Sequence, residues 1–234
     1  MSTTFIGSTG IMDVPAPGWL CASPTLFRHW GEYLVKMVSF SQLVLLEPGD
    51  NLELSRFDLT LVVSGGLYCS IHDHTGEAKH LLVSLMKRGC IAASTSLEKY
   101  GSTLTSSSKT TCLIIPNGAL PELLETIPQP DLLISEMHAY WDERHKEALA
   151  MQDRKDIERI VRVLCILSSH PGSARTNKGV ELMISKGEIR NLAGVQKRSA
   201  SRAFTALETA KVLHSEGYKL LYFTEEQPWQ NETP

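Results

Sequence analysis

The sequence predicts an α+β fold, with a β-roll toward the N-terminus, a long central helix and a winged helix-turn-helix at the C-terminal end. Short segments of alternating polarity, broken by Gly-containing turns, run from about residue 41 to 116. A stretch without Pro or Gly follows at 131–152. Residues 185–208 then combine a helix-cap signature, a glycine and a second helical run, which predicts two short helices joined by a tight turn.

Three segments carry the β-rich pattern of the roll. "LVLLEPGDNLEL" has an apolar run, a Pro-Gly-Asp turn and then alternation. "DLTLVVSGGLYCSIHDHTGEAKHLLVSLMKRGC" alternates in pieces that are separated by Ser-Gly-Gly and Thr-Gly-Glu. "GSTLTSSSKTTCLIIP" adds two more strands and ends at Pro116. Short strands with turn signals at this spacing are typical of a sandwich or roll.

The central stretch 131–152 predicts a helix with an apolar stripe at steps of three and four residues, interrupted only at Arg144. We interpret the stripe as a dimerisation surface, because a single helix against a small roll would not bury all of it. The alternative is that the stripe packs on its own domain. The stripe consists of Ile134, Met137, Trp141, Ala148 and Met151.

A second helix is expected over 153–169, since its apolar residues recur at helical spacing. His170-Pro171-Gly172 ends it, because Pro cannot continue a helix and Gly frees the turn. We interpret the following "GSARTNKG" as a polar connector.

Composition narrows the class of protein. The 234 residues are 42% hydrophobic and 21% charged, which is ordinary for a soluble globular chain. No stretch approaches the roughly 18 apolar residues of a membrane span, and the start lacks a secretory pattern, so we expect a cytoplasmic protein without a membrane partner. The five cysteines contain no Cys-x-x-Cys pair, which favours small buried hydrophobic residues over a zinc site or a disulfide framework.

Charge is unevenly distributed along the chain. Residues 1–150 hold ten Lys and Arg against sixteen Asp and Glu, whereas residues 175–223 hold nine against four. A basic segment attached to an acidic body indicates that the basic part meets a polyanion, and nucleic acid is the first candidate.

The segment "SKGEIRNLAGVQKRSASRAFTALE" concentrates this positive charge. Ser185 and Glu188 form the capping box that opens a helix, and Gly194 suits a sharp turn between helices. Lys and Arg can donate to guanine or phosphate, and Ser and Thr can bind phosphate or base edges. The side chains off the apolar face of the second helix are Gln196, Lys197, Arg198, Ser199, Ser201, Arg202 and Thr205.

The sequence after the second helix, "KVLHSEGYKLLYF", predicts two short strands around Glu216-Gly217. Such a hairpin would be a wing, and Lys219 could contact phosphate beside it. The combination of cap, turn glycine, basic outer face and wing favours DNA binding over a merely solvated helix face.

With these residues placed, the chain resembles the Crp/Fnr superfamily of bacterial transcription regulators. "ISKGEIRNLAGVQKRSASRAFTALE" is similar to the helix-turn-helix of that family, and "DRKDIERIVRVLCILSSHP" to the helix before it. "LVVSGGLYCSIHDHTGEAKHLLVSLMKRGC" resembles the family's cyclic-nucleotide-binding-like roll. The resemblance covers about residues 41–223, and it is more specific in the C-terminal part than in the roll.

The resemblance implies a homodimer with a winged helix at each end, and it places the recognition positions on Lys197, Arg198 and Arg202. Ser201-Arg202 matches the Ser-Arg of the oxygen-responsive branch. Arg198 stands where the family usually has an acid, and an Arg donates to guanine or phosphate where an acid accepts from cytosine. Arg190 departs from the small residue that is usual between the two helices, and its long side chain would reach toward phosphate.

The same comparison argues against the family's usual effectors. The stretches "GCIAAST" and "YGSTLTS" lack the acid and the arginine that bind cyclic AMP. Only Cys21 lies where the oxygen-sensing branch has its cluster of cysteines, so no iron–sulfur cluster is expected. His72 and His74 share a face of one strand with His80 across the hairpin, but no acid or Cys completes a metal site. We therefore expect no cofactor and no metal.

The sequence thus predicts a DNA-binding transcriptional regulator that acts as a homodimer, is not controlled by cyclic AMP and is not an enzyme. Double-stranded promoter or operator DNA is the expected partner, with RNA polymerase as a further candidate and the nucleoid as the site of the bound protein. The alternative is a ligand- or protein-binding sensory module with a weak or vestigial DNA-binding domain. The expected division is a roll domain over 1–128, a dimerisation helix over 129–152 and a DNA-binding domain over 153–234.

Overall fold

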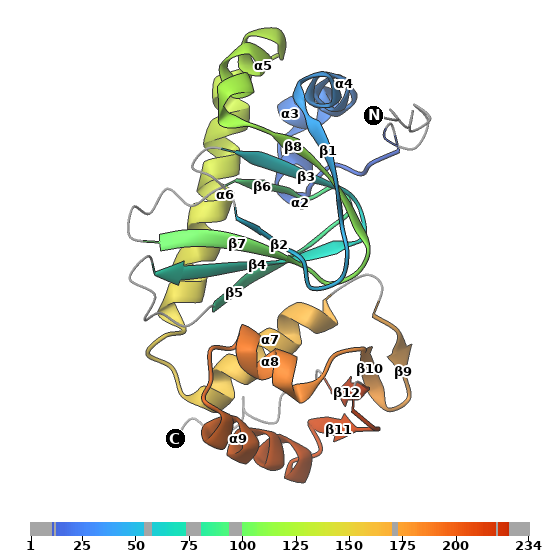
Figure 1. The fold of residues 1–234 in the computed structure, drawn as a ribbon, viewed down its shortest axis with the longest axis vertical. Helices are drawn as coiled ribbons and strands as arrows, with labels where there is room; N and C mark the ends of the chain where they lie inside the picture. The colour runs from blue at the N-terminus through green and yellow to red at the C-terminus, as the bar shows by residue number, and fades with distance from the viewer. Residues whose placement is uncertain are drawn as a thin grey trace.

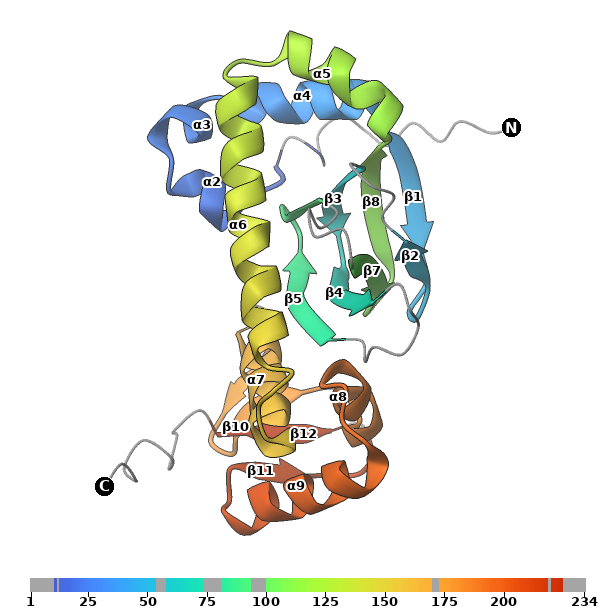
Figure 2. The same ribbon diagram turned by 90° about the vertical axis from the view of Figure 1, so that its left-hand side faces the viewer.

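The structure is a computed structural model that describes residues 11, 13–53, 58–73, 81–93, 100–169, 173–218 and 220–224. It has the predicted α+β architecture: a β-roll, a long helix alongside it, and a smaller C-terminal unit that holds the helix-turn-helix (Figure 1). Figure 2 shows the long helix running beside the roll, with the C-terminal unit at its lower end.

The roll consists of two four-stranded antiparallel sheets, with strand orders β1-β8-β3-β6 and β2-β7-β4-β5. In β4, Leu67, Cys69 and Ile71 are at most 1% exposed, and Leu104, the β7 partner of Cys69, is fully buried, as expected for strands with one face toward a core. The alternating segments of the sequence therefore fold as predicted. The strands are β1 (Gln42–Leu46), β2 (Asn51–Glu53), β3 (Leu59–Ser64), β4 (Gly66–Asp73), β5 (Leu81–Lys87), β6 (Ile91–Ala93), β7 (Tyr100–Ser106) and β8 (Thr110–Ile115).

Several short helices cover the end of the roll that lies away from the C-terminal unit, and the sequence analysis did not predict them. Trp30 donates its indole N–H to the Val14 carbonyl at 2.8 Å, and the Tyr33 hydroxyl donates to the Pro128 carbonyl at 2.9 Å. These bonds satisfy polar groups on side chains that are otherwise buried in the core. The helices are α2 (Gly18–Cys21), α3 (Pro24–Arg28), α4 (Trp30–Phe40), the 3-10 turn η1 (Asn117–Ala119) and α5 (Leu120–Thr126).

The long helix α6 (Pro130–Ala150) lies where it was expected, but its apolar stripe packs on its own chain. Met137 and Trp141 are each 2% exposed and Ala148 is fully buried, all within the core of the roll. Trp141 also donates its indole N–H to the Ile91 carbonyl of β6 at 2.9 Å. These three residues thus show the packing on their own domain that was the alternative, and their role in a dimer stays a prediction.

The other two residues of the predicted stripe are half-buried. Ile134 packs against the core of the roll, and Met151 follows α6 at the junction with the C-terminal unit. The solvent-exposed positions of α6 are mostly polar or small: Asp131, Ser135, Glu136, Ala139, Glu143, Lys146, Glu147 and Ala150. A face of this composition does not form an apolar coiled-coil seam.

The C-terminal unit, residues 156–224, is built on its own core of apolar side chains. Its helices are α7 (Asp156–Ser168), α8 (Lys186–Leu192) and α9 (Lys197–Thr209), and its strands are β9 (Arg175–Thr176), β10 (Gly179–Leu182), β11 (Leu213–Ser215) and β12 (Leu221–Phe223). The four strands form one antiparallel sheet in the order β11-β12-β10-β9. Part of the segment interpreted as a polar connector is therefore a hairpin, β9 with β10, which its Lys and Asn residues concealed.

None of the helices within the described residues is both long and apolar enough to cross a membrane. The division of the chain at residues 128 and 152 stays a prediction, although α6 and the turn before α7 lie near those boundaries.

Candidate DNA-binding interface

The first helix of the motif, α8, begins with the capping box that its sequence predicts. The backbone N–H of Glu188 donates to the Ser185 hydroxyl at 3.2 Å, and the backbone N–H of Ser185 donates to the Glu188 carboxylate at 2.9 Å. Two backbone donors that have no partner inside the helix are thereby satisfied, which fixes where α8 starts.

The turn between α8 and α9 depends on Gly194, whose φ is 60°. Residues with a Cβ adopt this left-handed conformation at a cost, so glycine is the natural residue there. The backbone N–H groups of Ala193 and Gly194 donate to the carbonyls of Ile189 and Asn191 and close the end of α8. The chain then turns into α9, as the sequence predicts.

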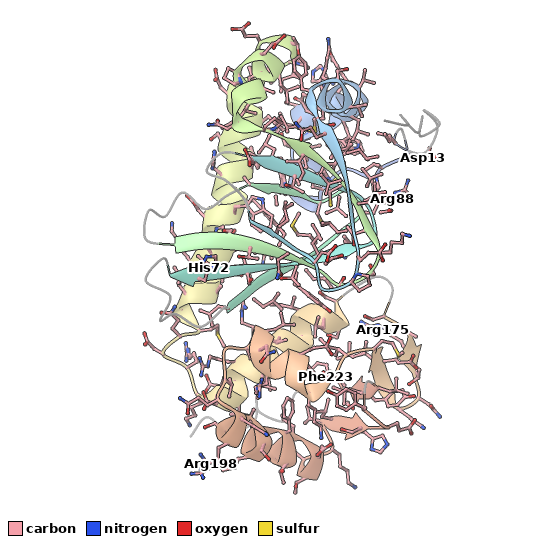
Figure 3. All side chains as sticks on the ribbon, viewed as in Figure 1. Asp13, His72, Arg88, Arg175, Arg198 and Phe223 are labelled. Atoms are coloured by element: carbon pink, nitrogen blue, oxygen red, sulfur yellow. The ribbon has the colours of Figure 1, made fainter. Side chains whose placement is uncertain are left out.

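Helix α9 has one face in the core and one face in solvent. Ala200, Phe204 and Leu207 are at most 5% exposed and anchor α9 against α7 and α8. On the opposite side, Lys197 and Arg198 are exposed, and Figure 3 shows Arg198 at the end of the molecule farthest from α5. We call this side the outer face of α9. It carries exposed Gln196, Lys197, Arg198, Ser201, Arg202 and Thr205, with Ser199 half-buried at its edge.

Arg190 and Lys219 are the other two residues of the predicted interface. Arg190 is half-buried, and its guanidinium donates to the Asn191 side-chain carbonyl at 2.6 Å through Nη2 and 3.2 Å through Nε. These two hydrogen bonds hold the Arg190 guanidinium against the neighbouring Asn191 side chain of α8. Lys219 lies outside the described residues.

Behind the outer face of α9, Glu208 connects α8, α9 and β11 through hydrogen bonds. The sequence alone did not predict this role. The Glu208 carboxylate accepts from Lys186 Nζ of α8 at 2.7 Å and from the Ser215 hydroxyl of β11 at 2.6 Å. Burial opposes ionisation of Glu208, but these hydrogen bonds outweigh it and lower the pKa of the carboxyl group. No local sequence pattern predicts this contact, because it joins residues that are far apart in sequence. Lys186 lies within the capping box of α8, and Ser215 lies in the strand β11.

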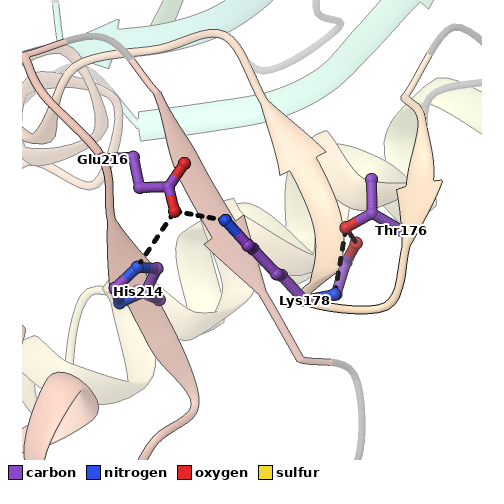
Figure 4. Close-up of polar contacts among 5 residues, drawn as sticks. Thr176, Lys178, His214 and Glu216 are labelled. Atoms are coloured by element: carbon purple, nitrogen blue, oxygen red, sulfur yellow. Dashed lines mark hydrogen bonds and ion pairs between the residues drawn. The ribbon is translucent and has the colours of Figure 1, made fainter.

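The predicted hairpin β11–β12 is present, with its turn at Glu216-Gly217, and an ion-pair cluster joins it to the β9–β10 hairpin. Lys178 pairs with the Glu216 carboxylate, His214 Nε2 lies 3.5 Å from the same oxygen, and the Lys178 ammonium lies 5.3 Å from the Tyr222 ring (Figure 4). The hydrogen bond from Lys178 lowers the pKa of Glu216. The Glu216 carboxylate at this turn is therefore paired with the Lys178 ammonium, which reduces its repulsion of a nearby anion.

Searches with protein-family models and among curated proteins find no match to the sequence. Solved structures do match the fold. CLP of Xanthomonas campestris, described as a c-di-GMP-responsive global regulator, aligns with a TM-score of 0.65 and 18% identity over 82% of this chain and 98% of its own. FixK2 of Bradyrhizobium japonicum gives 0.60 and 14% over 78% and 92%.

A protein of Eubacterium rectale assigned to the transcriptional regulators of the Crp/Fnr family gives a TM-score of 0.65 and 14% identity, over 87% of this chain and 95% of its own. This chain has the Crp/Fnr fold. The α8–turn–α9 motif and the β-roll thus belong to one known arrangement, with a cyclic-nucleotide-binding-like domain followed by a winged helix-turn-helix.

Within the Crp/Fnr fold, the roll offers few reactive groups. Among the described residues, no group of three His, Cys, Asp or Glu side chains is placed to hold a metal ion, and His74 and His80 lie outside those residues. Burial raises the pKa of the Cys69 thiol to about 12 and that of Cys112 to about 11, which leaves both unreactive near neutral pH. Cys21 is exposed, contrary to the expectation that all five cysteines are buried.

Proposed function

We propose that the chain is a sequence-specific DNA-binding transcriptional regulator that acts as a homodimer and is not controlled by cyclic AMP. The observation that carries the proposal is the outer face of α9. Lys197, Arg198 and Arg202 are exposed together there, and α9 has no acid before Glu208, which is held by Lys186 and Ser215. Side chains of this kind on an exposed helix suit the major groove.

Electrostatics near the N-terminus of α9 support the same reading. The first turn of the helix carries partial positive charge on its free backbone N–H groups, and Lys197 and Arg198 lie in that turn. The capping box and the left-handed Gly194 set the angle at which α9 leaves α8. A phosphate backbone passing this end would meet two cationic side chains and the helix terminus together.

The absence of cyclic AMP control rests on the residues of β7 and the turn before β6. Tyr100–Ser106 contains hydroxyl side chains but no arginine that could neutralise a buried phosphate. We further infer that the protein works on promoter DNA in the cytoplasm, with RNA polymerase as a second partner.

A salt titration tests the DNA-binding proposal. We expect the wild-type chain to bind duplex DNA with an affinity that falls steeply as salt rises, because each Lys or Arg that contacts phosphate releases counterions. An Arg198→Ala/Arg202→Ala double variant should bind at least tenfold more weakly and with a shallower slope, measured by fluorescence anisotropy between about 50 and 200 mM salt.

The matched control removes two exposed basic residues far from α9, Arg28→Ala with Lys109→Ala, and should leave both affinity and slope unchanged. Equally weak binding by wild type and the Arg198/Arg202 variant would overturn the proposal. The chain would then fit the alternative, a sensory module whose helix-turn-helix is vestigial.

A further inference from the structure

One residue of the roll, Leu82, lies in the contact between the roll and the C-terminal unit. Leu82 belongs to β5 of the roll, yet its side chain is 1% exposed and is part of the apolar core of the C-terminal unit. Its neighbours in sequence, Leu81 and Val83, are buried in the core of the roll. Three consecutive residues of one strand are therefore divided between the core of the roll and the core of the C-terminal unit.

Side chains of a strand point alternately to its two faces, so Leu82 points outward between two residues of the roll core, and a β-bulge lies beside it. Cys69 pairs with Ser84 but Ser70 pairs with Leu82, so Val83 is an extra residue on β5. A bulge bends the strand and increases its twist locally. On the same outward side of the sheet, Tyr68 and Leu85 also pack against the C-terminal unit. The outward face of β4 and β5 is thus a docking face for that unit.

A hydrogen bond fixes the register of the contact. Arg162 of α7 donates through Nη1 to the carbonyl of Leu82 at 2.6 Å. β5 is an edge strand of its sheet, so such carbonyls need partners from outside the sheet when they are buried. A bond from a guanidinium is stronger than one between neutral groups, and Arg162 is half-buried, so that burial lowers the pKa of its guanidinium.

The contact reaches the turn of the helix-turn-helix. Leu82 and Arg162 border a residual space of about 10 Å³, which leaves room for at most one water molecule. Leu192 and Ala193 border the same space, and these are the last residues before the Gly194 turn. The packing is therefore continuous from β5 through the end of α8 to the start of α9.

We propose that Leu82 and Arg162 are positioning residues for the DNA interface, which fix the orientation of α9 relative to the roll and hence to a second subunit. The proposal rests on the function proposed above. It assigns a role in DNA recognition to a roll residue that contacts no DNA. The contact made by Leu82 and Arg162 should set how strictly the protein reads the distance between two half-sites. A fixed orientation of α9 allows the two recognition helices of a dimer to bind half-sites at one spacing only.

The first test needs no DNA. Spin labels at Leu45→Cys on the roll and Thr205→Cys on α9, in a Cys21→Ser background diluted with unlabelled protein, report the distance between the two units. We expect one narrow distance distribution for the parent and a broad one when Leu82→Ala and Arg162→Ala are added. The volume-conserving Leu82→Met with Arg162→Lys should restore the narrow distribution. A distribution that stays narrow in the alanine variant overturns the proposal.

The second test uses the duplex that the wild-type chain selects from random-sequence DNA, the same duplex with one or two base pairs added at its centre, and a single half-site. Wild type should lose at least tenfold in affinity on each lengthened duplex. The Leu82→Ala/Arg162→Ala variant should lose less than threefold, while its half-site affinity stays within twofold of wild type. Leu43→Ala, an exposed apolar change on the roll, is the control and should behave as wild type.

The two tests separate the two proposals. If the alanine variant keeps the full spacing penalty, the positioning role is wrong although the protein binds DNA. If the wild type selects no DNA, the proposed function is wrong, and the spin-label distances alone then decide whether the two residues hold the units together.

Discussion

At the scale of single residues, His145 is the side chain most at odds with its surroundings. It is fully buried on α6, its ring centre lies 5.9 Å from that of Trp141, and neither ring nitrogen has a hydrogen-bond partner among the described residues. Burial lowers the pKa of this imidazole, although Asp142 and the nearby backbone of Trp141 partly oppose the effect. A charged imidazole would be poorly solvated there.

This predicts a stability loss on mild acidification. Above the ordinary pKa of about 6.5, His145 is neutral in both the folded and unfolded chains and contributes no pH dependence. Below it, the unfolded chain takes up a proton that the folded chain resists, so stability falls as pH falls toward the lowered folded-state pKa. The difference in unfolding free energy between pH 8 and pH 5, from urea titrations, should be smaller in His145→Leu than in wild type.

His138→Leu, a half-exposed change on the same helix, is the control for His145 and should keep the wild-type pH dependence. If His145→Leu loses stability between pH 8 and pH 5 as steeply as wild type does, the buried imidazole is not the cause.

At the scale of elements, the sequence predicted helices and strands wherever their signals are local. The capping box of α8, the Gly194 turn and the alternation of β4 depend on neighbouring residues, and each is confirmed. The Glu208 hub, the bulge at Val83 and the partner of the α6 stripe depend on contacts between distant segments. A periodic stripe shows that a helix face is buried but not what buries it, which is why the sequence alone could not show that Met137 and Trp141 pack against the roll.

The start of α8 allows a matched pair of stability predictions. Ser185→Ala removes the hydroxyl that accepts from Glu188 N–H, and should lower the free energy of unfolding by about 1 kcal/mol. Gly187→Ala should raise it by up to about 1 kcal/mol, because a Cβ there meets only the Ser185 Oγ at 3.7 Å and alanine favours helix. Thermal unfolding of both variants beside wild type measures the two shifts.

Opposite signs for these two changes are the decisive outcome. If both lower stability, the start of α8 is limited by something other than its cap and its helix propensity. DNA binding by either variant should follow its stability, since neither residue lies on the outer face of α9.

At the scale of the whole molecule, the roll and the C-terminal unit are two cores joined by α6 and by the β5 contact. Charge follows the same division, because the acidic part of the chain includes the roll and α6, whereas the basic part, residues 175–223, includes α8 and α9. If the chain binds DNA as proposed, this arrangement favours contact through the basic end and disfavours nonspecific contact through the rest. The outer face of α9 could be predicted from sequence, whereas its orientation could not, because Leu82 lies about eighty residues before the Arg162 that holds it.

Two such molecules bound together would read a DNA sequence with two-fold symmetry. A homodimer of the proposed kind presents two α9 helices related by a two-fold axis, so selection from random-sequence DNA should return an inverted repeat with half-sites about 10 base pairs apart, or a multiple of one helical turn. Arg198 should favour guanine at the position it meets, since its guanidinium can donate to both O6 and N7. In Arg198→Glu the preference at that position alone should move to cytosine, whose amino group a carboxylate accepts. Selection of single, unpaired half-sites would contradict the dimer while leaving DNA binding intact, and an unchanged base preference in Arg198→Glu would remove Arg198 from base recognition.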